Sequence, residues 1–369
     1  MIDQNDVLLK MHIEKMSQTP QNPEFHGEGD VWSHTQMVCE SLVNSPDWQA
    51  LESRCQEILY TAALLHDIGK TTNTREESGT IVSPNHSSAG ERIARRTLWR
   101  DFGMCGTCES MQFRESVCSL IRHHSKPFHF YDVKEPDKTV ITLAAHGELV
   151  PYFTNEMLGV LVEADMKGRI TEGIDDRLEH LYLFRETAKE EGCFTTPFPF
   201  PSPFSRYAFL SGRDIYPGQE LYKDTWGTVI MLAGLPGTGK DTYIKKHYSD
   251  LPMVSLDNLR KKMGISPTEP QWKVVNAAKE QAKDYLRKKQ PFVWNATNVT
   301  PFMREKQIRL FKDYNASTKI VYLETEWDTL LSRNKGRENP VPETAIEGMA
   351  EKLIPPNLSE AHEVEWVVT

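Results

Sequence analysis

The stretch Gly234-Leu235-Pro236-Gly237-Thr238-Gly239-Lys240-Asp241-Thr242 decides how this sequence is interpreted. The apolar run 228–233 before it predicts a buried parallel strand, and the run 243–248 after it predicts a helix. A strand, a glycine-rich loop and a helix in this order are the context in which a G-x-x-x-x-G-K loop binds phosphate. Backbone N–H groups and the helix N-terminus then surround the phosphate, and the lysine adds a positive charge. We predict a nucleotide-binding site that includes Gly234, Gly237, Thr238, Gly239, Lys240, Asp241 and Thr242.

The residue after the lysine departs from the usual pattern of such loops. A Ser or Thr hydroxyl normally holds Mg²⁺ there, whereas this chain has Asp241. A carboxylate can hold the metal directly or through water, and it suits the first turn of a helix. It can equally repel a phosphate, in which case Thr242 is the second candidate ligand. The sequence leaves both alternatives open.

Length and composition indicate two domains of ordinary globular type. The chain has 369 residues, of which 39% are hydrophobic and 26% charged, with a net charge of −9. No apolar run approaches the ~18 residues of a membrane span, and the first residues do not form a signal peptide. Six scattered cysteines suit a reducing compartment, so we expect a cytoplasmic protein without a membrane partner.

The pattern of the chain changes near its middle. Helical periodicity dominates residues 3–190, where strand-like alternation is almost absent. The proline- and phenylalanine-rich segment 195–204 excludes a helix or a central strand and predicts an extended linker. After residue 226, strands predicted at 228–233, 253–256, 291–295, 319–323 and 364–368 alternate with helices, which indicates a parallel sheet. We therefore expect an all-α domain (1–194), a linker (195–225) and an α/β domain (226–369).

The helical half contains a set of residues suited to a metal centre. The stretch Ala62-Ala63-Leu64-Leu65-His66-Asp67-Ile68-Gly69-Lys70 puts His66 and Asp67 where an apolar helix ends. Adjacent helical residues diverge by about 100°, but two metals that share a bridging carboxylate can use both. Neutral imidazoles and carboxylates suit a transition metal that activates water for phosphoester hydrolysis. The further candidates are His34, His86, His123, His124 and Asp165.

Taken singly, each histidine is more often a satisfied core or surface residue than a ligand. Together, His34, the His66-Asp67 pair and Asp165 resemble the HD phosphohydrolase superfamily. The resemblance implies an all-α fold and a divalent transition metal such as Mn, Fe, Co or Ni, with two ions if His86 and His124 also bind. His123 is the alternative to His124 as this metal ligand. Lys70 either stabilises phosphate charge during catalysis or only caps the helix.

Charged residues beyond the phosphate loop suggest a kinase site. Asp257 follows the strand at 253–256, and a spacing of three residues puts Arg260 on the same helix face. Such a carboxylate can accept a hydroxyl proton while the arginine binds a phosphate, although an N-cap aspartate and a surface arginine explain the spacing as well. Arg333 and Arg337 recur at i and i+4 before a predicted mobile loop, where they either neutralise a transferring phosphoryl group or form a solvated basic face.

In this order, these features resemble the P-loop polynucleotide kinases. The resemblance implies that Lys240 and Arg337 act in catalysis with ATP and Mg²⁺, that Asp257 is the general base for a 5′-hydroxyl, and that Arg260 binds the acceptor phosphate. Arg333 and Arg337 would then bind the nucleotide. Such kinases carry an Asp-Ala-Thr-Asn-like tetrad after a strand, which here is Asn295-Ala296-Thr297-Asn298 and lacks the carboxylate.

The whole chain is similar to the bacterial HD domain–polynucleotide kinases, which heal nucleic-acid ends. This resemblance implies that the first domain hydrolyses a 3′-phosphate or 2′,3′-cyclic phosphate with Asp67 and Lys70, and that the second phosphorylates a 5′-hydroxyl. The partners would be RNA or DNA ends, ATP or another NTP, and a nucleic-acid ligase. The alternatives are an HD-type nucleotide phosphohydrolase fused to a small-molecule kinase, and a non-catalytic nucleotide-gated binding module.

Overall fold

The computed structural model describes residues 2, 5–266 and 269–369. The chain divides into two compact units. One unit, here called the helical unit, comprises Met1–Met104 and Glu109–Phe198. The other, the α/β unit, comprises Cys105–Cys108 and Pro199–Thr369. The change of unit at Phe198 and Pro199 lies inside the segment expected to be a linker, and the three-part division 1–194, 195–225 and 226–369 stays a prediction.

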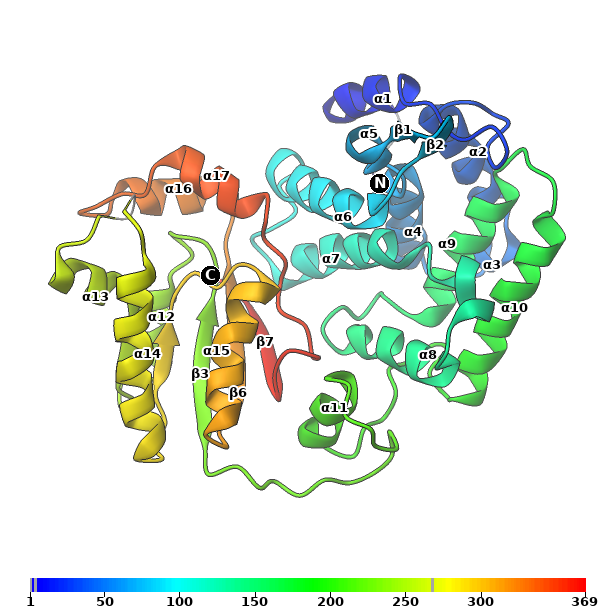
Figure 1. Ribbon diagram of the computed structural model, residues 1–369. Helices are drawn as coiled ribbons and strands as arrows, with labels where there is room; N and C mark the ends of the chain where they lie inside the picture. Colours follow the sequence, from blue (N-terminus) through cyan, green and yellow to red (C-terminus); the bar gives the residue numbers. More distant parts are fainter. Residues whose placement is uncertain (1, 3–4, 267–268) are drawn as a thin grey trace. The chain divides into compact units, whose positions relative to one another are not determined.

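The helical unit is built from α-helices of 4 to 17 residues, which are labelled in Figure 1. Its α-helices are α1 (Lys10–Ser17), α2 (Val31–Val43), α3 (Pro46–Gln49), α4 (Ser53–Leu65), α5 (Lys70–Asn73), α6 (His86–Arg96), α7 (Cys108–His123), α8 (Pro136–Ala145), α9 (Asn155–Lys167) and α10 (Ile174–Glu190). Short helical turns add η1 (Val7–Leu9), η2 (Thr97–Asp101), η3 (Pro127–Asp132) and η4 (His146–Glu148).

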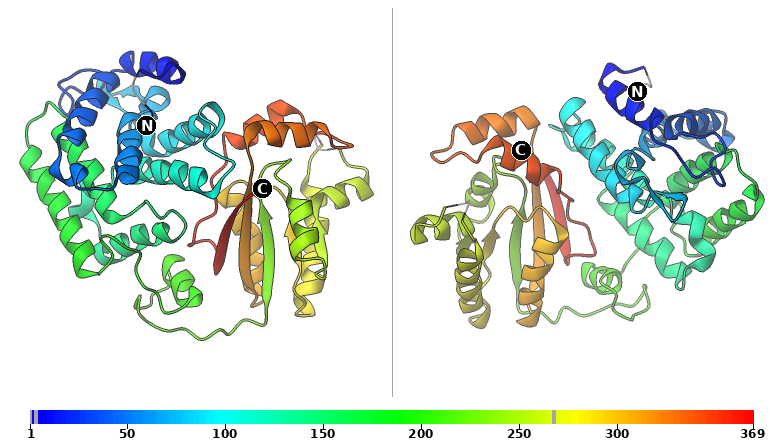
Figure 2. Two further views of the ribbon diagram at one scale, coloured as in Figure 1. Left: turned by 180° about the vertical axis from the view of Figure 1, so that it is seen from behind. Right: turned by 45° about the horizontal axis from the view of Figure 1, so that its top comes forward.

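Capping residues set the start of the helices that form the centre of this unit. The Asp30 carboxylate accepts hydrogen bonds from the backbone N–H groups of Trp32 and Ser33 and starts α2. The Thr154 hydroxyl accepts from Met157 N–H and starts α9, which is almost entirely buried. Helix α9 packs against α2, α4 and α10, so the core of the unit surrounds it (Figure 2).

One feature of the helical unit, a short β-hairpin, differs from the sequence-based expectation. Strands β1 (Arg75–Glu77) and β2 (Thr80–Val82) form an antiparallel hairpin where almost no strand was expected. Its two-residue turn, Ser78-Gly79, has positive φ angles of 52° and 80°, the conformation that joins twisted strands most readily. Both strands are short and largely exposed, so they lack the apolar alternation that would predict them.

The α/β unit contains a five-stranded sheet in which all strands are parallel. The strand order is β4-β5-β3-β6-β7. The bounds are β3 (Thr228–Ala233), β4 (Met253–Ser255), β5 (Val293–Asn295), β6 (Ser317–Glu324) and β7 (Glu363–Val368). Each lies at a predicted strand, which confirms the prediction of a parallel α/β fold. Strand β3 is central, so the loop that follows it opens at the middle of the carboxyl edge.

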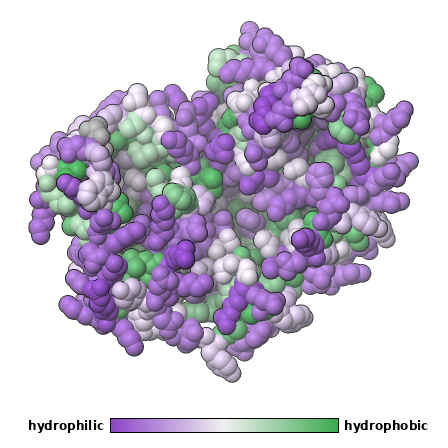
Figure 3. Space-filling view, in the orientation of Figure 1, coloured by the Kyte–Doolittle hydropathy of each residue, from purple (hydrophilic) through white to green (hydrophobic). Residues whose placement is uncertain are grey.

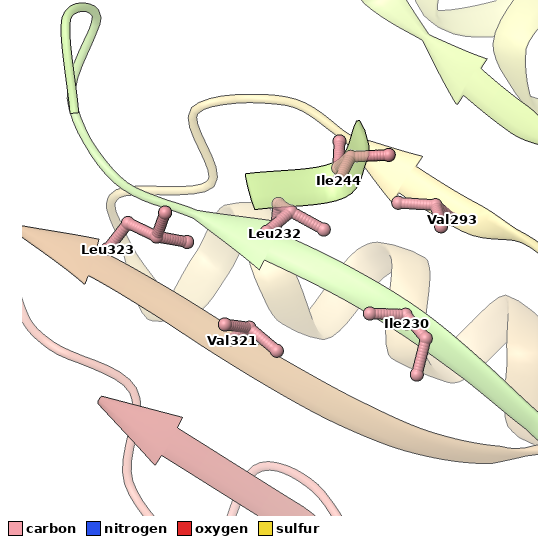
Figure 4. Close-up of a cluster of buried hydrophobic side chains, with 6 residues drawn as sticks. All are labelled: Ile230, Leu232, Ile244, Val293, Val321 and Leu323. Atoms are coloured by element: carbon pink, nitrogen blue, oxygen red, sulfur yellow. The ribbon is translucent and has the colours of Figure 1, made fainter. Parts of the chain in front are cut away.

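Helices cover both faces of this sheet (Figures 1 and 2). Those on its faces are α12 (Lys240–His247), α14 (Trp272–Arg287) and α15 (Pro301–Asp313). Helix α13 (Leu256–Met263) packs against α14, and α16 (Trp327–Lys335) and α17 (Glu343–Ala350) lie above the carboxyl edge of the sheet in Figure 1. On one face, Ile244 of α12 packs on a cluster from three neighbouring strands (Figure 4). The strand residues of this cluster are Ile230, Leu232, Val293, Val321 and Leu323. On the other face, Phe292 contacts Tyr285 of α14 and Phe311 of α15.

The predicted linker is not extended throughout. Helix α11 (Pro203–Leu210) begins inside it, at the proline-rich segment that was expected to exclude a helix. Pro203 occupies the first position of the helix, where its missing N–H removes no hydrogen bond. The Ser202 hydroxyl caps the helix by accepting from Ser205 N–H. The prediction that no helix starts in this segment was therefore wrong.

The described part of the chain contains no helix that is both long enough and apolar enough to span a bilayer. The face drawn in Figure 3 is mostly hydrophilic, with apolar residues in small scattered groups.

Candidate active sites

The helical unit brings the four best metal candidates together at one buried point. His34 comes from the first turn of α2, the His66-Asp67 pair follows α4, and Asp165 comes from α9. His34 Nε2 lies 3.1 Å from Asp165 Oδ1 and 3.3 Å from His66 Nε2. Asp67 Oδ2 lies 3.3 Å from His66 Nε2. All four side chains are at most 2% exposed.

A tight turn after α4 lets both members of the His66-Asp67 pair reach the site. Helix α4 ends at Leu65, and Ile68 N–H bonds back to the Leu65 carbonyl. The following Gly69 packs against the start of α6, where an added Cβ would lie 2.0 Å from the His86 carbonyl oxygen. Only glycine permits this approach, which brings His86 close to Asp67.

Asp67 links this point to a second group of histidines. Its Oδ1 lies 3.5 Å from His86 Nε2 and 3.9 Å from His124 Nε2. The two imidazole nitrogens of His86 and His124 are 3.3 Å apart. Asp67 therefore offers one carboxylate oxygen to each group, which is the arrangement that a bridging ligand of two metals requires.

Hydrogen bonds fix which nitrogen of each histidine faces the site. The Nδ1 atoms of His66, His86 and His124 lie 2.7–2.9 Å from the backbone carbonyl oxygens of Ala63, Ser83 and Ile121. His34 Nδ1 likewise lies 3.1 Å from the Gly168 carbonyl oxygen. Nδ1 is therefore the proton donor, and each Nε2 of a neutral ring directs a lone pair into the site.

The donor set fits divalent metal ions. Lone pairs of neighbouring imidazoles that face one another at 3.3 Å repel unless a cation lies between them. Within the described residues, Asp67 Oδ1 and Asp165 Oδ2 are buried without a hydrogen-bond partner. Imidazole and carboxylate ligands suit Mn, Fe, Co, Ni or Zn. A bound metal would supply an activated water for hydrolysis.

The electrostatics of the cluster also favour positive charge at its centre. Burial lowers the pKa of His66, but the carboxylates of Asp67 and Asp165 outweigh burial, and the net shift is upward. Burial and the neighbouring His86 and His66 lower the pKa of His124 to about 3, so this ring is neutral and free to bind a metal at pH 7. Burial raises the pKa of Asp67, but Lys70 and His66 hold it well below its usual range.

Lys70 lies inside this site and does not cap α4. It is buried, and its Nζ lies 2.7 Å from Asp67 Oδ2 and 2.6 Å from Gln21 Oε1. His26 Nε2 is 3.5 Å from the same ammonium group. The interpretation of Lys70 as a helix cap was therefore wrong, because Lys70 is the first residue of a new helix, α5.

Several residues of this site have no recognisable pattern in the sequence. Glu28 Oε1 lies 2.8 Å from His26 Nδ1 and 2.9 Å from His34 Nδ1, so it joins both rings. Arg169 donates to Asp165 Oδ1 at 2.6 Å. Arg169 follows Asp165 by only four residues, just beyond the end of α9, whereas His26 and Glu28 precede α2. Packing of α2 against α9 brings these two segments together at the site.

His123 is directed away from the metal cluster. Its ring packs against His146 and Phe153, with centroid distances of 5.2 and 5.6 Å. His124, one residue later, faces His86 and Asp67. The geometry therefore favours His124 over its rival as a candidate ligand.

The α/β unit forms the phosphate loop between β3 and α12. Gly234, Gly237 and Gly239 have positive φ angles of 145°, 91° and 77°, which side-chain-bearing residues rarely adopt. Lys240 Nζ donates to the backbone carbonyls of Gly234 and Leu235, both at 2.8 Å. Burial lowers the pKa of Lys240 to about 8, although Asp241 and Asp257 act in the opposite direction. Loop carbonyls thus hold the lysine where a phosphate would bind.

The other predicted members of the loop differ in their surroundings. The Thr238 hydroxyl is buried and donates to the Leu235 carbonyl at 2.9 Å, so this side chain stabilises the loop itself. Asp241 and Thr242 are exposed on the first turn of α12. Asp241 Oδ1 accepts a hydrogen bond of 2.7 Å from Asn295 Nδ2.

The tetrad 295–298 supports the loop from the neighbouring strand. The Thr297 carbonyl accepts from Gly234 N–H at 2.8 Å, and Asn298 Nδ2 donates to the Leu232 carbonyl at 2.7 Å. Asn298 has a positive φ of 46°, a conformation that asparagine tolerates better than most residues. The tetrad therefore fixes the backbone where β3 ends.

The candidate acceptor residues lie on the helix after β4. Ser255 caps α13, which leaves Asp257 within the first helical turn, so the N-cap interpretation of Asp257 was wrong. Arg260 Nη1 donates to Asp257 Oδ1, and Arg260 Nε donates to Gln271 Oε1 at 2.8 Å. Arg337 Nη2 lies 3.5 Å from Asp257 Oδ2.

The two candidate lid arginines have different positions. Arg333 lies on α16 and donates to Thr369 Oγ1 at 3.1 Å, and Thr369 in turn donates to the Thr238 carbonyl of the phosphate loop. Helix α16 ends at Lys335, so Arg337 lies beyond it and not on the expected helix face. The structure thus brings Arg333 to the loop and Arg337 to Asp257.

Comparisons with known proteins agree with this division. The HD domain family matches residues 32–146, and the family described as AAA domain matches residues 229–356. An L-seryl-tRNA(Sec) kinase of Methanococcus maripaludis is 26% identical over 137 residues, which are 35% of this chain and 53% of that protein. The chain thus spans about half the length of this curated relative.

Two solved structures of kinases are also similar to part of the chain. A putative kinase from Chloroflexus aurantiacus has 17% identity, a TM-score of 0.33 and coverage of 39% of this chain and 89% of its own. A gluconokinase from Sinorhizobium meliloti has 17% identity, a TM-score of 0.29 and coverage of 39% and 83%. From the family matches and the parallel sheet, the chain combines a helical domain that matches the HD domain family with an α/β domain that carries a phosphate-loop motif and matches the AAA domain family.

Proposed function

We propose that this protein heals the ends of broken nucleic acid. The helical unit would remove a 3′-phosphate or a 2′,3′-cyclic phosphate with two divalent metal ions. The α/β unit would transfer the γ-phosphate of ATP or another NTP to a 5′-hydroxyl. Breakage that leaves these two ends cannot be repaired by a ligase until both ends are converted, which is why the two chemistries belong together.

The observation that carries the proposal is that one chain contains a buried histidine–aspartate cluster and a glycine-rich loop, which suit opposite chemistries of phosphate. Asp67 faces two histidine groups and suits hydrolysis with a metal-activated water. Asp257 lies beside Arg260 and Arg337 and suits the acceptance of a hydroxyl proton during phosphoryl transfer. His34, His66, His86, His124 and Asp165 would complete the metal ligands.

Support for a nucleic-acid acceptor comes from two exposed aromatic residues of the α/β unit. Trp272 is 60% exposed at the start of α14, and Phe302 is 65% exposed at the start of α15. Each has a lysine ammonium above its ring, Lys273 at 5.5 Å and Lys306 at 4.0 Å. An aromatic face beside a cation suits a nucleobase and its phosphate.

A second candidate is a kinase for a hydroxyl that is not a nucleic-acid end. The curated relative is named for a seryl-tRNA, and a seryl group is such an acceptor. In that case Arg260 would bind a phosphate of a small molecule or of an aminoacylated RNA, and the helical unit would hydrolyse a nucleotide.

One incubation separates the candidates. An oligonucleotide with a 5′-hydroxyl and a 2′,3′-cyclic phosphate, as RNA and as DNA, is mixed with ATP, Mg²⁺ and trial Mn²⁺, Co²⁺ or Ni²⁺. We expect both ends to be converted and acceptor use to increase with oligonucleotide length. Phosphorylation of free nucleosides, serine or gluconate without use of oligonucleotides would overturn the proposal.

A further inference from the structure

Two positions that normally bind Mg²⁺ in phosphate-loop enzymes have unusual residues in this chain. The first follows the loop lysine and is normally Ser or Thr, and the second is an aspartate at the end of a neighbouring strand. Here the first position is Asp241, and the strand beside β3 ends in Asn295. Asp241 alone would add a negative charge to the site, and Asn295 alone would remove one. Either substitution by itself would therefore impair the site.

The structure joins these two residues. Asn295 is buried to 7% exposure at the end of β5, opposite Leu232 of β3. Its amide donates to Asp241 Oδ1 at 2.7 Å, across 54 residues of sequence. The contact fixes the orientation of the carboxylate on the first turn of α12, in the way that a hydrogen-bonded neighbour orients a metal ligand.

The Asp241 charge is free to meet a cation. Within residues 2, 5–266 and 269–369, the Asp241 side chain has Asn295 as its only hydrogen-bond partner. Asp241 takes part in no ion pair within the same residues. The adjacent Lys240 donates to loop carbonyls. The Asp241 side chain is exposed on the first turn of α12, directly after the phosphate loop. An aspartate that only stabilised the helix dipole would not need a buried amide directed at it.

We infer that the Mg²⁺-binding carboxylate of the kinase site lies on helix α12 in this chain and not at the end of strand β5, an exchange of the carboxylate between two elements. Asp241 on α12 supplies the carboxylate oxygen, and Asn295 on β5 is the positioning residue that orients it. The pair keeps the single negative charge of the usual arrangement, so the charge beside the nucleotide phosphates is unchanged. This inference rests on the proposed kinase function and names two residues of the same site.

The test measures metal-dependent nucleotide binding and not turnover. The Kd of ADP is determined by calorimetry in Mg²⁺ and in EDTA, and the ratio of the two values gives the Mg²⁺ effect. The variants are Asp241→Ser, Asn295→Ala and the double variant Asp241→Ser/Asn295→Asp, which restores the usual pair. Asp250→Asn removes a charge from an exposed position in the loop after α12 and is the matched control.

We expect Asp241→Ser to abolish most of the Mg²⁺ effect while ADP binding in EDTA stays equal or becomes tighter, because a negative charge beside the phosphates is lost. Asn295→Ala should reduce the Mg²⁺ effect by about 10- to 100-fold, the usual loss when the partner of a metal ligand is removed. The double variant should recover the Mg²⁺ effect to within about tenfold of the parent. The control should match the parent.

Two results would overturn the exchange. The first is a full Mg²⁺ effect in Asp241→Ser, and the second is a double variant no better than Asp241→Ser. Binding of Mn²⁺ followed by electron paramagnetic resonance in the presence of ADP gives the same comparison without calorimetry. If the parent binds no ADP in either condition, the proposed kinase function itself is wrong, which is a different result from failure of the exchange alone.

Discussion

The candidate metal site of the helical unit and the candidate phosphate site of the α/β unit differ in how completely their side chains are positioned without a ligand. His34, His66 and Asp165 are fully buried, and each faces its neighbours at fixed distances. By contrast, the Asp257 side chain is 64% exposed. The Asp257 carboxylate is contacted by Arg260 of the same helix, α13, and by Arg337, which follows α16.

This difference follows from what each site has to bind. Buried carboxylates and imidazoles are costly without a cation, so a site of this kind suits a resident metal that also stabilises the fold. An open site with arginines on separate segments can admit a nucleotide and an acceptor and then close around them. The predictions below test the contrast, from the largest expected effect to the smallest.

The first prediction concerns the residue that joins the two histidine groups. Asp67→Asn keeps the volume of the side chain but removes the bridging charge. We expect 3′-end hydrolysis to fall by on the order of 10⁴-fold or more, because activation of water by the metals is lost. Bound metal, measured by mass spectrometry, should fall in parallel. Phosphorylation at the 5′ end should stay within a few-fold of the parent.

The control for this change is Asp47→Asn, which removes an exposed carboxylate from the same unit. Loss of both reactions in a folded Asp67→Asn protein would contradict two independent sites and indicate one composite active site.

The second prediction is the converse change in the open site. Asp257→Ala should slow 5′ phosphorylation by about 10²- to 10⁴-fold, the usual contribution of a general base. Binding of ATP and 3′-end hydrolysis should be unaffected. Asp284→Ala, at an exposed position of α14, is the matched control. An unchanged rate in Asp257→Ala would mean that another group accepts the hydroxyl proton.

The third prediction tests whether a residue that orients a metal ligand, without binding the metal itself, is needed in the buried site. Glu28→Gln should weaken metal binding by about 10- to 100-fold, because Glu28 orients the His34 ring. Titration with Mn²⁺ measures this loss, and excess metal should restore hydrolysis. Glu24→Gln, at an exposed position nearby, is the control. If excess metal does not restore activity, Glu28 has a role other than orientation.

The fourth prediction concerns the pH dependence of nucleotide binding. Burial lowers the pKa of Lys240 to about 8 in the free protein, and a bound phosphate would raise it. The lysine is charged below pH 8, so affinity for ADP in EDTA should be constant there. Above pH 8 the amine must take up a proton when ADP binds, and the Kd should increase by up to about tenfold per pH unit. Lys240→Arg should remove this slope.

The smallest effect is expected at the acceptor arginine. Arg260→Ala should raise the KM for oligonucleotides a few-fold and leave ATP binding unchanged. If Arg260 contacts a nucleic-acid phosphate, the slope of log affinity against log salt should decrease by about one. An unchanged slope with a raised KM for a small acceptor would favour the second candidate function.

The sequence by itself determined the elements whose formation depends on neighbouring residues. Strand β3 has the predicted bounds, because an apolar run is a signal carried by a few neighbouring residues. The glycines and Lys240 identify the phosphate loop for the same reason. The hairpin β1–β2 and helix α11 were not predicted, since the first lacks apolar alternation and the second starts with a proline.

The tertiary structure alone decided which side chains meet. His123 and His124 are adjacent in sequence, yet one packs on Phe153 and the other faces His86. Asp241 and Asn295 each departed from a motif, and their contact emerged only when β5 paired with β3. Local patterns fix the backbone, but contacts between distant residues depend on how the elements pack, which short-range spacing in the sequence does not encode.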